Sequence, residues 1–291
     1  FSLILIITIS LTPFFTIGSA ASSSSYYHKY VVDQNGVTSV NVDFESSDTT
    51  SSSWVFVPKF TSWSRSVTVG SITQYQTVET SQVPGVDEDY YFYQAFTFSF
   101  KSSAGSFKMN IQFSVSTGAL IIEPRGIFYS PLIGFEPQSI GRAEVLFPTG
   151  YAVKEAVASG QNEYSPTQTT ANSVLFNLQE NIMRLQVEFS TDVSTPALTT
   201  IKQGVFSFEA VKRYESYARD ILRVFNTVYS NLTRLFNVTL TSVEVRFFIP
   251  DFDTFLSVGG YVPFTQGEIG EININIFFVR AVNGTIEVIA V

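Results

Sequence analysis

The sequence predicts a mostly β protein, in which an N-terminal antiparallel β-sandwich precedes an incomplete α+β unit with one long helix on a small sheet. Three observations support this fold class. Segments of alternating apolar and polar residues recur at short spacing through the first two thirds of the chain. Only residues 206–236 carry apolar side chains at steps of three and four. Alternation then returns in residues 243–249 and 272–278.

The composition of the 291 residues allows a sizeable core and excludes several kinds of protein. Apolar residues make up 45% and aromatic residues 15%, whereas charged residues make up only 14%, below the ~25% usual in soluble domains. The net charge is −8 without any basic run, so a nucleic-acid partner is not expected. The absence of cysteine excludes disulfides, zinc–thiolate sites and a cysteine nucleophile from this sequence.

The first residues have the pattern of an export signal. An apolar run ends in Gly18, Ser19, Ala20 and Ala21, which predicts a signal peptide over residues 1–21 and a secreted or surface-exposed protein. Pro13 argues against a stable membrane span. The alternative is an uncleaved N-terminal anchor, which would be the only contact of the chain with a membrane. Because the sequence opens on a phenylalanine without a basic region, we expect its upstream end to be missing.

A linker is expected at residues 22–29, and the β-sandwich is expected at residues 30–194. The Asn35-Gly36 pair predicts a hairpin turn before a strand around residues 40–44. Further strands are predicted at residues 54–57, 66–71, 74–79, 90–101, 107–116, 119–123, 127–129 and 143–147. Residues 153–158 could form one helical turn or a surface loop. Two alternating segments, 174–178 and 183–189, predict a closing hairpin.

The boundary between the two units is expected in the loop 194–200, which contains Pro196. The α+β unit is then expected to cover residues 201–291 and to be truncated at its C-terminus. Its predicted elements are a helix over residues 206–236 and strands over residues 243–249, 272–278 and 286–291.

No residue in this sequence is expected to be catalytic or to hold a metal or cofactor. His28 is the only histidine, and one histidine builds neither a Ser-His-Asp triad nor a histidine-ligated metal centre. Because it follows the predicted cleavage site closely, we expect it to be an exposed residue of a flexible tail. Gly259-Gly260 has neither the spacing nor the lysine of a phosphate-binding loop.

Two acidic groups are weaker candidates. Asp87, Glu88 and Asp89 form a dense turn that could hold a calcium ion, with a solvated turn as the alternative. Asp251 and Asp253 flank one residue, so an extended loop would present both carboxylates on one side. They could act as part of a glycosidase pair, although nothing identifies a partner across a cleft, and a loop cap is the alternative.

Three Asn-x-Ser/Thr sequons begin at Asn231, Asn237 and Asn283. Export would allow glycosylation, and Asn237 and Asn283 are the preferred sites. Asn231 is a poorer acceptor because it lies within the predicted helix.

The element order after Pro196 resembles the N-terminal half of the catalytic domain of gluzincin metallopeptidases, the M1 aminopeptidase-like and peptidase MA-like group. The resemblance rests on the long helix, the strand ending in Phe247-Phe248-Ile249-Pro250, the glycine-containing loop and the two last strands. Residues 143–151 (AEVLFPTGY) also resemble a strand end of the preceding β-rich domain of that group.

The resemblance implies that the next element would be a helix with His-Glu-x-x-His, which binds zinc. It also implies that residues 272–278 form the edge strand lining the cleft, with Ile272, Asn273, Ile274 and Asn275 along the substrate. The Gly-x-Met-Glu-Asn motif of true aminopeptidases is absent, which places aminopeptidase specificity in doubt.

The function expected from these features is the N-terminal part of an exported, surface-associated zinc metallopeptidase-like protein. In that case zinc would bind only to a missing C-terminal half, and the partners would be peptide substrates or other surface proteins. The alternative is a non-catalytic, β-rich surface protein such as an adhesin or envelope component, which the low charge and the sequons would also suit.

Overall fold

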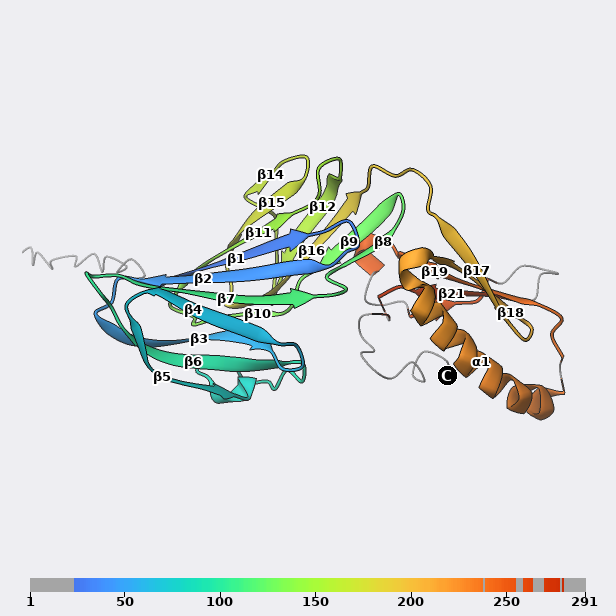
Figure 1. Ribbon diagram of the computed structural model, residues 1–291, viewed down its shortest axis with the longest axis horizontal. Helices are drawn as coiled ribbons and strands as arrows, with labels where there is room; N and C mark the ends of the chain where they lie inside the picture. The colour runs from blue at the N-terminus through green and yellow to red at the C-terminus, as the bar shows by residue number, and fades with distance from the viewer. Residues whose placement is uncertain (1–23, 238, 255–258, 264–269, 278, 280–291) are drawn as a thin grey trace, which may run out of the picture.

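The computed structural model describes residues 24–237, 239–254, 259–263, 270–277 and 279. It confirms the mostly β fold class, with one long helix among the described residues (Figure 1). The expected signal peptide and the expected last strand at residues 286–291 lie outside these ranges. Strands up to residue 190 form three sheets, and strands from residue 198 onward form a fourth sheet that helix α1 covers.

A seven-stranded sheet is the centre of the β-rich part, in the order β14-β15-β11-β1-β2-β7-β4. Its strands are β1 (Ser24–Val32), β2 (Thr38–Ser46), β4 (Trp63–Val69), β7 (Phe107–Val115), β11 (Ile140–Leu146), β14 (Gln168–Thr169) and β15 (Ser173–Leu178). The predicted turn joins β1 to β2, and Gly36 adopts a φ of +84° there. On its other side β1 pairs in parallel with β11, so the sandwich is not purely antiparallel.

Two smaller sheets complete the β-rich part. The six-stranded sheet has the order β13-β12-β16-β9-β8, with β10 paired to β16, and the three-stranded sheet has the order β3-β6-β5. The strands of the six-stranded sheet are β8 (Ala119–Ile122), β9 (Arg125–Tyr129), β10 (Ile133–Gly134), β12 (Ala152–Ser159), β13 (Glu163–Tyr164) and β16 (Ile182–Ser190). Those of the three-stranded sheet are β3 (Thr50–Pro58), β5 (Ser71–Val78) and β6 (Tyr93–Lys101).

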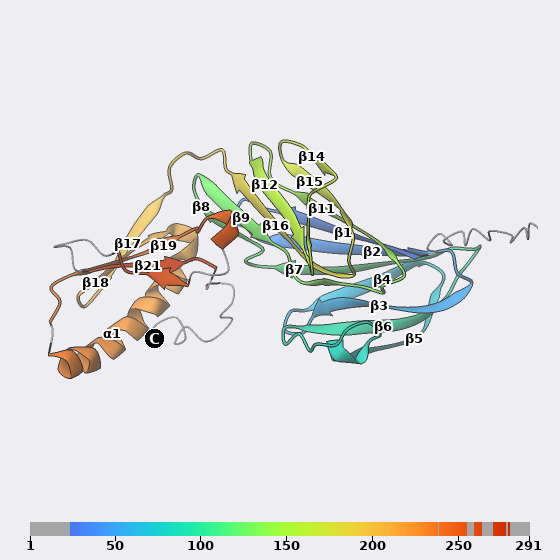
Figure 2. The ribbon, with the colours of Figure 1, turned by 180° about the vertical axis from the view of Figure 1, so that it is seen from behind.

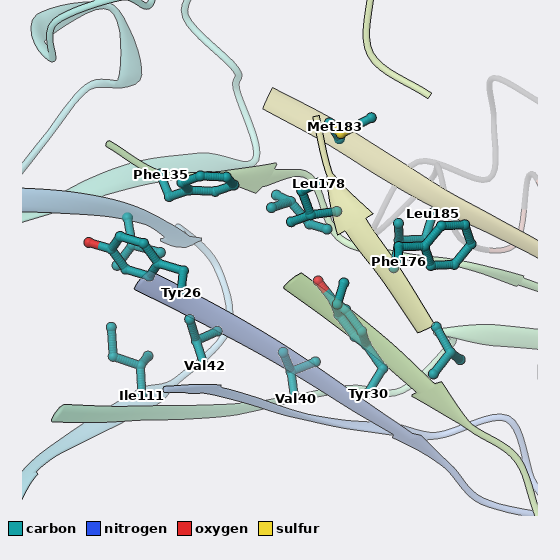
Figure 3. Close-up of a cluster of buried hydrophobic side chains, with 14 of the residues drawn as sticks. Tyr26, Tyr30, Val40, Val42, Ile111, Phe135, Phe176, Leu178, Met183 and Leu185 are labelled. Carbon is teal, nitrogen blue, oxygen red and sulfur yellow. The ribbon is translucent and has the colours of Figure 1, made fainter. Parts of the chain in front are cut away.

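One hydrophobic core joins the large sheet to both smaller sheets, because alternate residues of each strand point inward. Figure 3 shows part of this core, in which Tyr26, Tyr30, Val40, Val42 and Ile111 of the large sheet lie across from Phe135, Met183 and Leu185. The three-stranded sheet contributes Phe96, Phe98 and Phe100, of which Phe98 and Phe100 stack with Phe107 of β7 and Phe96 stacks with Phe98.

Three expectations for this part were wrong. The linker at residues 22–29 is largely strand β1, which lies in the middle of the large sheet. Residues 153–158 belong to strand β12 and form neither a helical turn nor a loop. The segments 174–178 and 183–189 do not form a hairpin, because β15 pairs with β11 and β14 whereas β16 pairs with β9, β10 and β12. Both strands have a buried face toward the same core, so the short connection carries the chain from one layer to the other.

The α+β unit is a five-stranded mixed sheet in the order β17-β18-β19-β21-β20. Its elements are β17 (Leu198–Gln203), β18 (Phe206–Val211), α1 (Glu215–Phe236), β19 (Val243–Phe248), β20 (Gly260–Tyr261) and β21 (Glu271–Asn275). Strands β18, β19 and β21 run parallel, and α1 connects the first two. Ala218, Ile221 and Leu222 of α1 are buried against this sheet. The 3-10 turns in the described ranges are η1 (Thr80–Gln82), η2 (Lys212–Tyr214) and η3 (Phe252–Thr254).

The predicted helix over residues 206–236 begins nine residues later than expected, at Glu215. Phe206, Phe208 and Ala210 are buried at every second position, because Gly204 turns the chain at a φ of +60° and lets β17 pair with β18. The apolar residues of this short segment fit both the helical and the strand period. Asn237 ends the helix in the left-handed conformation, with a φ of +51°.

The hairpin of β8 and β9 contacts the α+β unit, toward which it points in both ribbon views (Figures 1 and 2). Leu120 and Ile127 of this hairpin belong to the core of the α+β unit. The backbone N–H of Ile121 donates to the Tyr214 hydroxyl over 2.8 Å, and burial raises the pKa of this tyrosine to about 12. The α+β unit is therefore joined to the β-rich part through buried apolar and polar contacts.

Candidate functional site

The candidate site is a cavity of about 670 Å³ at the junction of the sheets, which we call the junction cavity. The β-rich part supplies most of its wall, and the α+β unit supplies Tyr217, Phe277 and Val279. The residues that line it are Val37, Pro58, Phe60, Thr61, Phe92, Tyr93, Phe113, Ser114, Val115, Ser116, Thr117, Tyr129, Pro131, Arg184, Tyr217, Phe277 and Val279. The junction cavity thus depends on segments that are more than 200 residues apart in the chain.

The junction cavity lies at the carboxyl edge of the parallel strands. Tyr217 belongs to the first turn of α1, which follows the end of β18, and Phe277 follows the end of β21. Open sheets with parallel strands bind their ligands at this edge, where the connections diverge. A mixed sheet of this kind therefore offers its ligand site on the side that the β-rich part closes.

Arg184 is the one charged residue among the described residues that line the junction cavity. Met183 and Leu185 on either side of it point into the core, so the alternation of β16 directs Arg184 outward. Its Nη1 donates to the Ser130 carbonyl oxygen over 3.0 Å and approaches the Tyr93 hydroxyl at 3.4 Å. Its guanidinium carbon lies 5.6 Å from the ring centroid of Tyr93 and 5.2 Å from that of Tyr129.

The support beneath Arg184 is rigid. Ser130 is fully buried, and its hydroxyl donates to the Pro131 carbonyl over 2.7 Å while accepting from the Leu185 N–H over 2.9 Å. The Tyr93 hydroxyl accepts a further hydrogen bond from the Leu132 N–H over 2.9 Å. Both groups that hold Nη1 are therefore fixed by their own hydrogen bonds.

Among the residues that the structure describes, no aspartate or glutamate lines the junction cavity and no carboxylate forms an ion pair with Arg184. Arg125, by contrast, pairs with Glu188 over 3.1 Å on the same face of β16, two alternations further along the strand. The junction cavity is thus a positively charged site in a protein whose net charge is −8.

Exposed aromatic residues extend the wall of the junction cavity outward. Phe60, Tyr91 and Phe92 are 59%, 70% and 49% exposed, and their ring centroids lie 5.1–6.3 Å from one another. Two of them, Phe60 and Phe92, also line the junction cavity. Large exposed apolar groups that gather in one place are typical of binding surfaces.

His28 is not the exposed tail residue that the sequence predicted. It is 3% exposed on β1, and its ring lies 6.3 Å from Tyr26 and 6.1 Å from Phe135. The expectation failed because the chain forms a central strand immediately after the predicted cleavage site. Its Nε2 has no hydrogen-bond partner in the described part of the chain, and burial lowers its pKa to about 3.

Of the acidic candidates, Asp89 caps its loop. Asp89 accepts hydrogen bonds from the Ser81 hydroxyl over 2.5 Å and from the Ser81 N–H over 3.0 Å, and these bonds lower the pKa of its carboxyl. Asp253 lies in the 3-10 turn η3, which begins at Phe252, the residue after Asp251. These two aspartates therefore do not lie in an extended loop. Within the described ranges, no three histidine or acidic residues gather as metal ligands.

The strand with the four resemblance-derived residues is not the edge of its sheet. Strand β20 pairs with β21, joining Tyr261 to Asn273 and Gly260 to Ile274. Asn273 and Asn275 are buried, and their side chains bond to the Glu271 carboxylate over 3.0 Å and to the Phe277 N–H over 2.9 Å. Ile272 and Ile274 pack in the core of the α+β unit. The structure thus contradicts the edge position, while contact of these residues with a substrate stays a prediction.

The sequons differ in their setting. Asn231 is exposed but lies inside α1, as expected. Asn237 is exposed and ends that helix. Asn283 lies outside the described residues.

The sequence alone did not identify Arg184 or the tyrosines beside it. The local signal was the alternation of residues 183–189, which places Arg184 on the polar side of a strand. Nothing in the spacing connects it to Tyr93 or Tyr217, because only the packing of the sheets brings these residues together.

Comparison with known proteins does not assign this chain to a family. No protein-family profile and no curated protein matches the sequence. Among solved structures, the chain is similar to the crystal structure of an aminopeptidase N family protein from Idiomarina loihiensis, with a TM-score of 0.29 and 10% identity. The match covers 86% of this chain and 42% of that protein, so this chain spans less than half of its length. Of the helices in the described ranges, none is long and apolar enough to span a membrane.

Proposed function

We propose that this chain is the substrate-binding, N-terminal part of an exported, surface-associated metallopeptidase-like protein, and that the junction cavity receives peptide. The observation that supports this proposal best is the position of the junction cavity at the carboxyl edge of β18 and β21. The element order that suggested the gluzincin resemblance is consistent with it, since β18, α1, β19 and β21 follow one another as a strand–helix–strand series.

The catalytic zinc belongs to a part of the protein beyond this sequence. One buried histidine and no cysteine do not fit a zinc site, so the residues described here would bind and orient peptide only. The His-Glu-x-x-His helix that the resemblance implies would supply the metal and a general base. The proposal therefore requires a reading frame longer than 291 residues.

The test is the full reading frame and the protein that it encodes. We expect a His-Glu-x-x-His sequence downstream, about one zinc per purified full-length protein, and cleavage of a fluorogenic peptide that a chelator abolishes. A full-length variant with the first histidine of that motif replaced by alanine is the control for contaminating peptidases. A downstream sequence without the motif, or full-length protein without zinc, would refute the peptidase proposal.

The proposed export of the protein is tested separately. We propose that residues 1–21 are removed on secretion, which terminal sequencing of secreted protein would detect. In a glycosylating host we expect modification of Asn237 rather than Asn231, because the second lies within α1. Mass spectrometry of the deglycosylated peptides distinguishes the two sites.

A non-catalytic surface protein is the second candidate, and the exposed rings of Phe60, Tyr91 and Phe92 favour it. In this case the aromatic surface itself would bind another surface protein. We expect replacement of Phe60 and Tyr91 by serine to abolish binding of the chain to cells of the source. Unchanged cell binding by this variant would exclude the adhesin candidate.

A further inference from the structure

We propose that the junction cavity binds an organic carboxylate with an aromatic or branched aliphatic body, and that Arg184 receives the carboxylate group. This inference does not depend on zinc or on peptidase activity. A C-terminal peptide carboxylate and a free aryl acid share this chemistry, and the experiment below distinguishes them.

The free hydrogen-bonding capacity of Arg184 indicates an anion. A guanidinium has five N–H donors, of which the two on Nη1 contact Ser130 and Tyr93. The donors on Nε and Nη2 have no hydrogen-bond partner among the residues that the structure describes. These two nitrogens form the planar edge that matches the two oxygens of a carboxylate, a group that arginine frequently binds through two parallel hydrogen bonds.

The fixed position of Arg184 lowers the entropic cost of binding. The guanidinium rests against the rings of Tyr93 and Tyr129 and is tied to the buried Ser130. An arginine held in this way loses little side-chain freedom when a ligand arrives. The same rings shield one side from water, which strengthens a charge-assisted hydrogen bond.

The remaining wall selects the body of the ligand. Phe60, Phe92, Phe113 and Phe277 line the junction cavity, and Ser114, Ser116 and Thr117 add neutral polar groups. Apolar cavities with a few convergent polar groups hold small organic ligands, and aromatic walls favour aromatic or branched bodies. A single negative charge on such a body therefore matches the one guanidinium found among the described residues that line the cavity.

Multiply charged ligands fit this site less well. A phosphate or nucleotide is normally held by several cations or by a row of backbone N–H groups, whereas the lining residues that the structure describes include one guanidinium. The net charge of −8 further opposes polyanions at low ionic strength. A cationic ligand would meet Arg184, and no carboxylate balances this charge among the lining residues that the structure describes.

Isothermal titration calorimetry with three small probes tests the proposal on the whole chain. The probes are N-acetylphenylalanine, its uncharged amide, and 3-phenylpropionate. We expect both acids to bind, and the amide to bind at least about tenfold more weakly, because it lacks the charge-assisted bond. Tighter binding of N-acetylphenylalanine than of 3-phenylpropionate would identify a peptide C-terminus as the ligand. Equal binding of the two acids would identify a general aryl carboxylate site.

Variants locate the binding. Arg184→Met should weaken the binding of both acids at least about tenfold and leave the affinity for the amide unchanged. Arg65→Met is the matched control, because Arg65 stacks at 3.7 Å on the Tyr75 ring and lies outside the junction cavity. This control should bind all three probes as the unmodified chain does.

Two further variants protect the test from a folding defect in Arg184→Met. Arg184→Lys keeps the charge but loses the planar edge, so it should bind the acids with intermediate affinity. Ser116→Trp places a large side chain at an exposed position of the cavity wall and removes no charge. It should weaken the binding of all three probes. Equal binding of acid and amide to the unmodified chain, absence of binding up to about 5 mM, or acid binding that survives both Arg184→Met and Ser116→Trp would overturn the proposal.

Discussion

Acidification should destabilise this protein through His28, and the substitution His28→Leu should remove that part of the effect. His28 lies on the central strand β1, paired to Val42 on one side and to Ala143 on the other. Its buried ring has Tyr26 and Phe135 as aromatic neighbours. Burial lowers the pKa of the imidazole from 6.5 to about 3, because a buried cation would lose its hydration.

Proton linkage gives the direction and the magnitude of this pH effect on the free energy of unfolding. Between the two pKa values the unfolded chain binds a proton at His28 and the folded chain does not, so the free energy of unfolding rises with pH. The contribution of the neutral His28 side chain to the free energy of unfolding is therefore fully present above pH 6.5 and is lost as the pH falls toward 3. Each pH unit is worth about 1.4 kcal/mol, so the loss reaches roughly 3 kcal/mol at about pH 4.5. This is a large share of a typical stability of about 5–15 kcal/mol.

The assay is urea unfolding of the parent chain and of His28→Leu at about pH 7 and pH 4.5, followed by tryptophan fluorescence. Leucine has a volume similar to histidine and does not titrate, so the parent should lose roughly 3 kcal/mol more than the variant on acidification. His28→Gln, which is neutral and polar, should behave like His28→Leu in this difference. Carboxylates titrate equally in all three proteins and cancel. An equal loss in parent and variants would refute the burial of a neutral His28.

Two further substitutions test the packing of the fold by the free energy of unfolding. Gly36→Ala should lower the free energy of unfolding by about 1–3 kcal/mol more than Gly105→Ala does. Both glycines have a positive φ, so the strain of the backbone is common to the two changes. They differ in space, because a Cβ at Gly36 would lie 2.1 Å from the Ala119 carbonyl oxygen, whereas a Cβ at Gly105 would have no atom within 4 Å. Similar costs would contradict the close approach of the β1–β2 turn to β8. Arg213→Met should cost about 3–5 kcal/mol because it leaves the buried carboxylate of Glu123 unpaired, whereas Arg219→Met, which breaks an exposed pair within α1, should cost under about 0.5 kcal/mol. Rescue of Arg213→Met by a second change, Glu123→Gln, is expected, and its absence would show that the pair is not buried.

The sequence by itself determined those features that depend on neighbours along the chain. The alternation of Val40, Val42 and Phe44 predicted a half-buried strand, and the Asn35-Gly36 pair before it predicted the turn to β1. The apolar stripe of residues 206–236 predicted the long helix in the same way, although the helix itself covers Glu215–Phe236. Side-chain period reports which face of an element is buried, so these predictions needed no knowledge of the partner.

The same period was ambiguous where a segment was short. Phe208 and Val211 fit a helical step of three, whereas Phe206, Phe208 and Ala210 fit the strand period, and only the pairing of β18 with β17 and β19 decided for the strand. His28 was misjudged for a related reason. Its position after an apolar leader suggested a tail, while the ladder that buries it is formed with residues 39–46 and 140–146.

Only the tertiary structure decided which strands are neighbours and what gathers between them. Strands β15 and β16 are adjacent in sequence and carry the same pattern, yet they lie in opposite sheets. The junction cavity combines Tyr93, Arg184 and Tyr217 from three separate elements, and no local signal relates them. The physical reason is that alternation states that a face is buried but not against which partner, since burial of apolar surface is non-directional. The partner is selected by the packing of the whole chain, and the charge of Arg184 acquires its role from the aromatic walls that this packing brings to it.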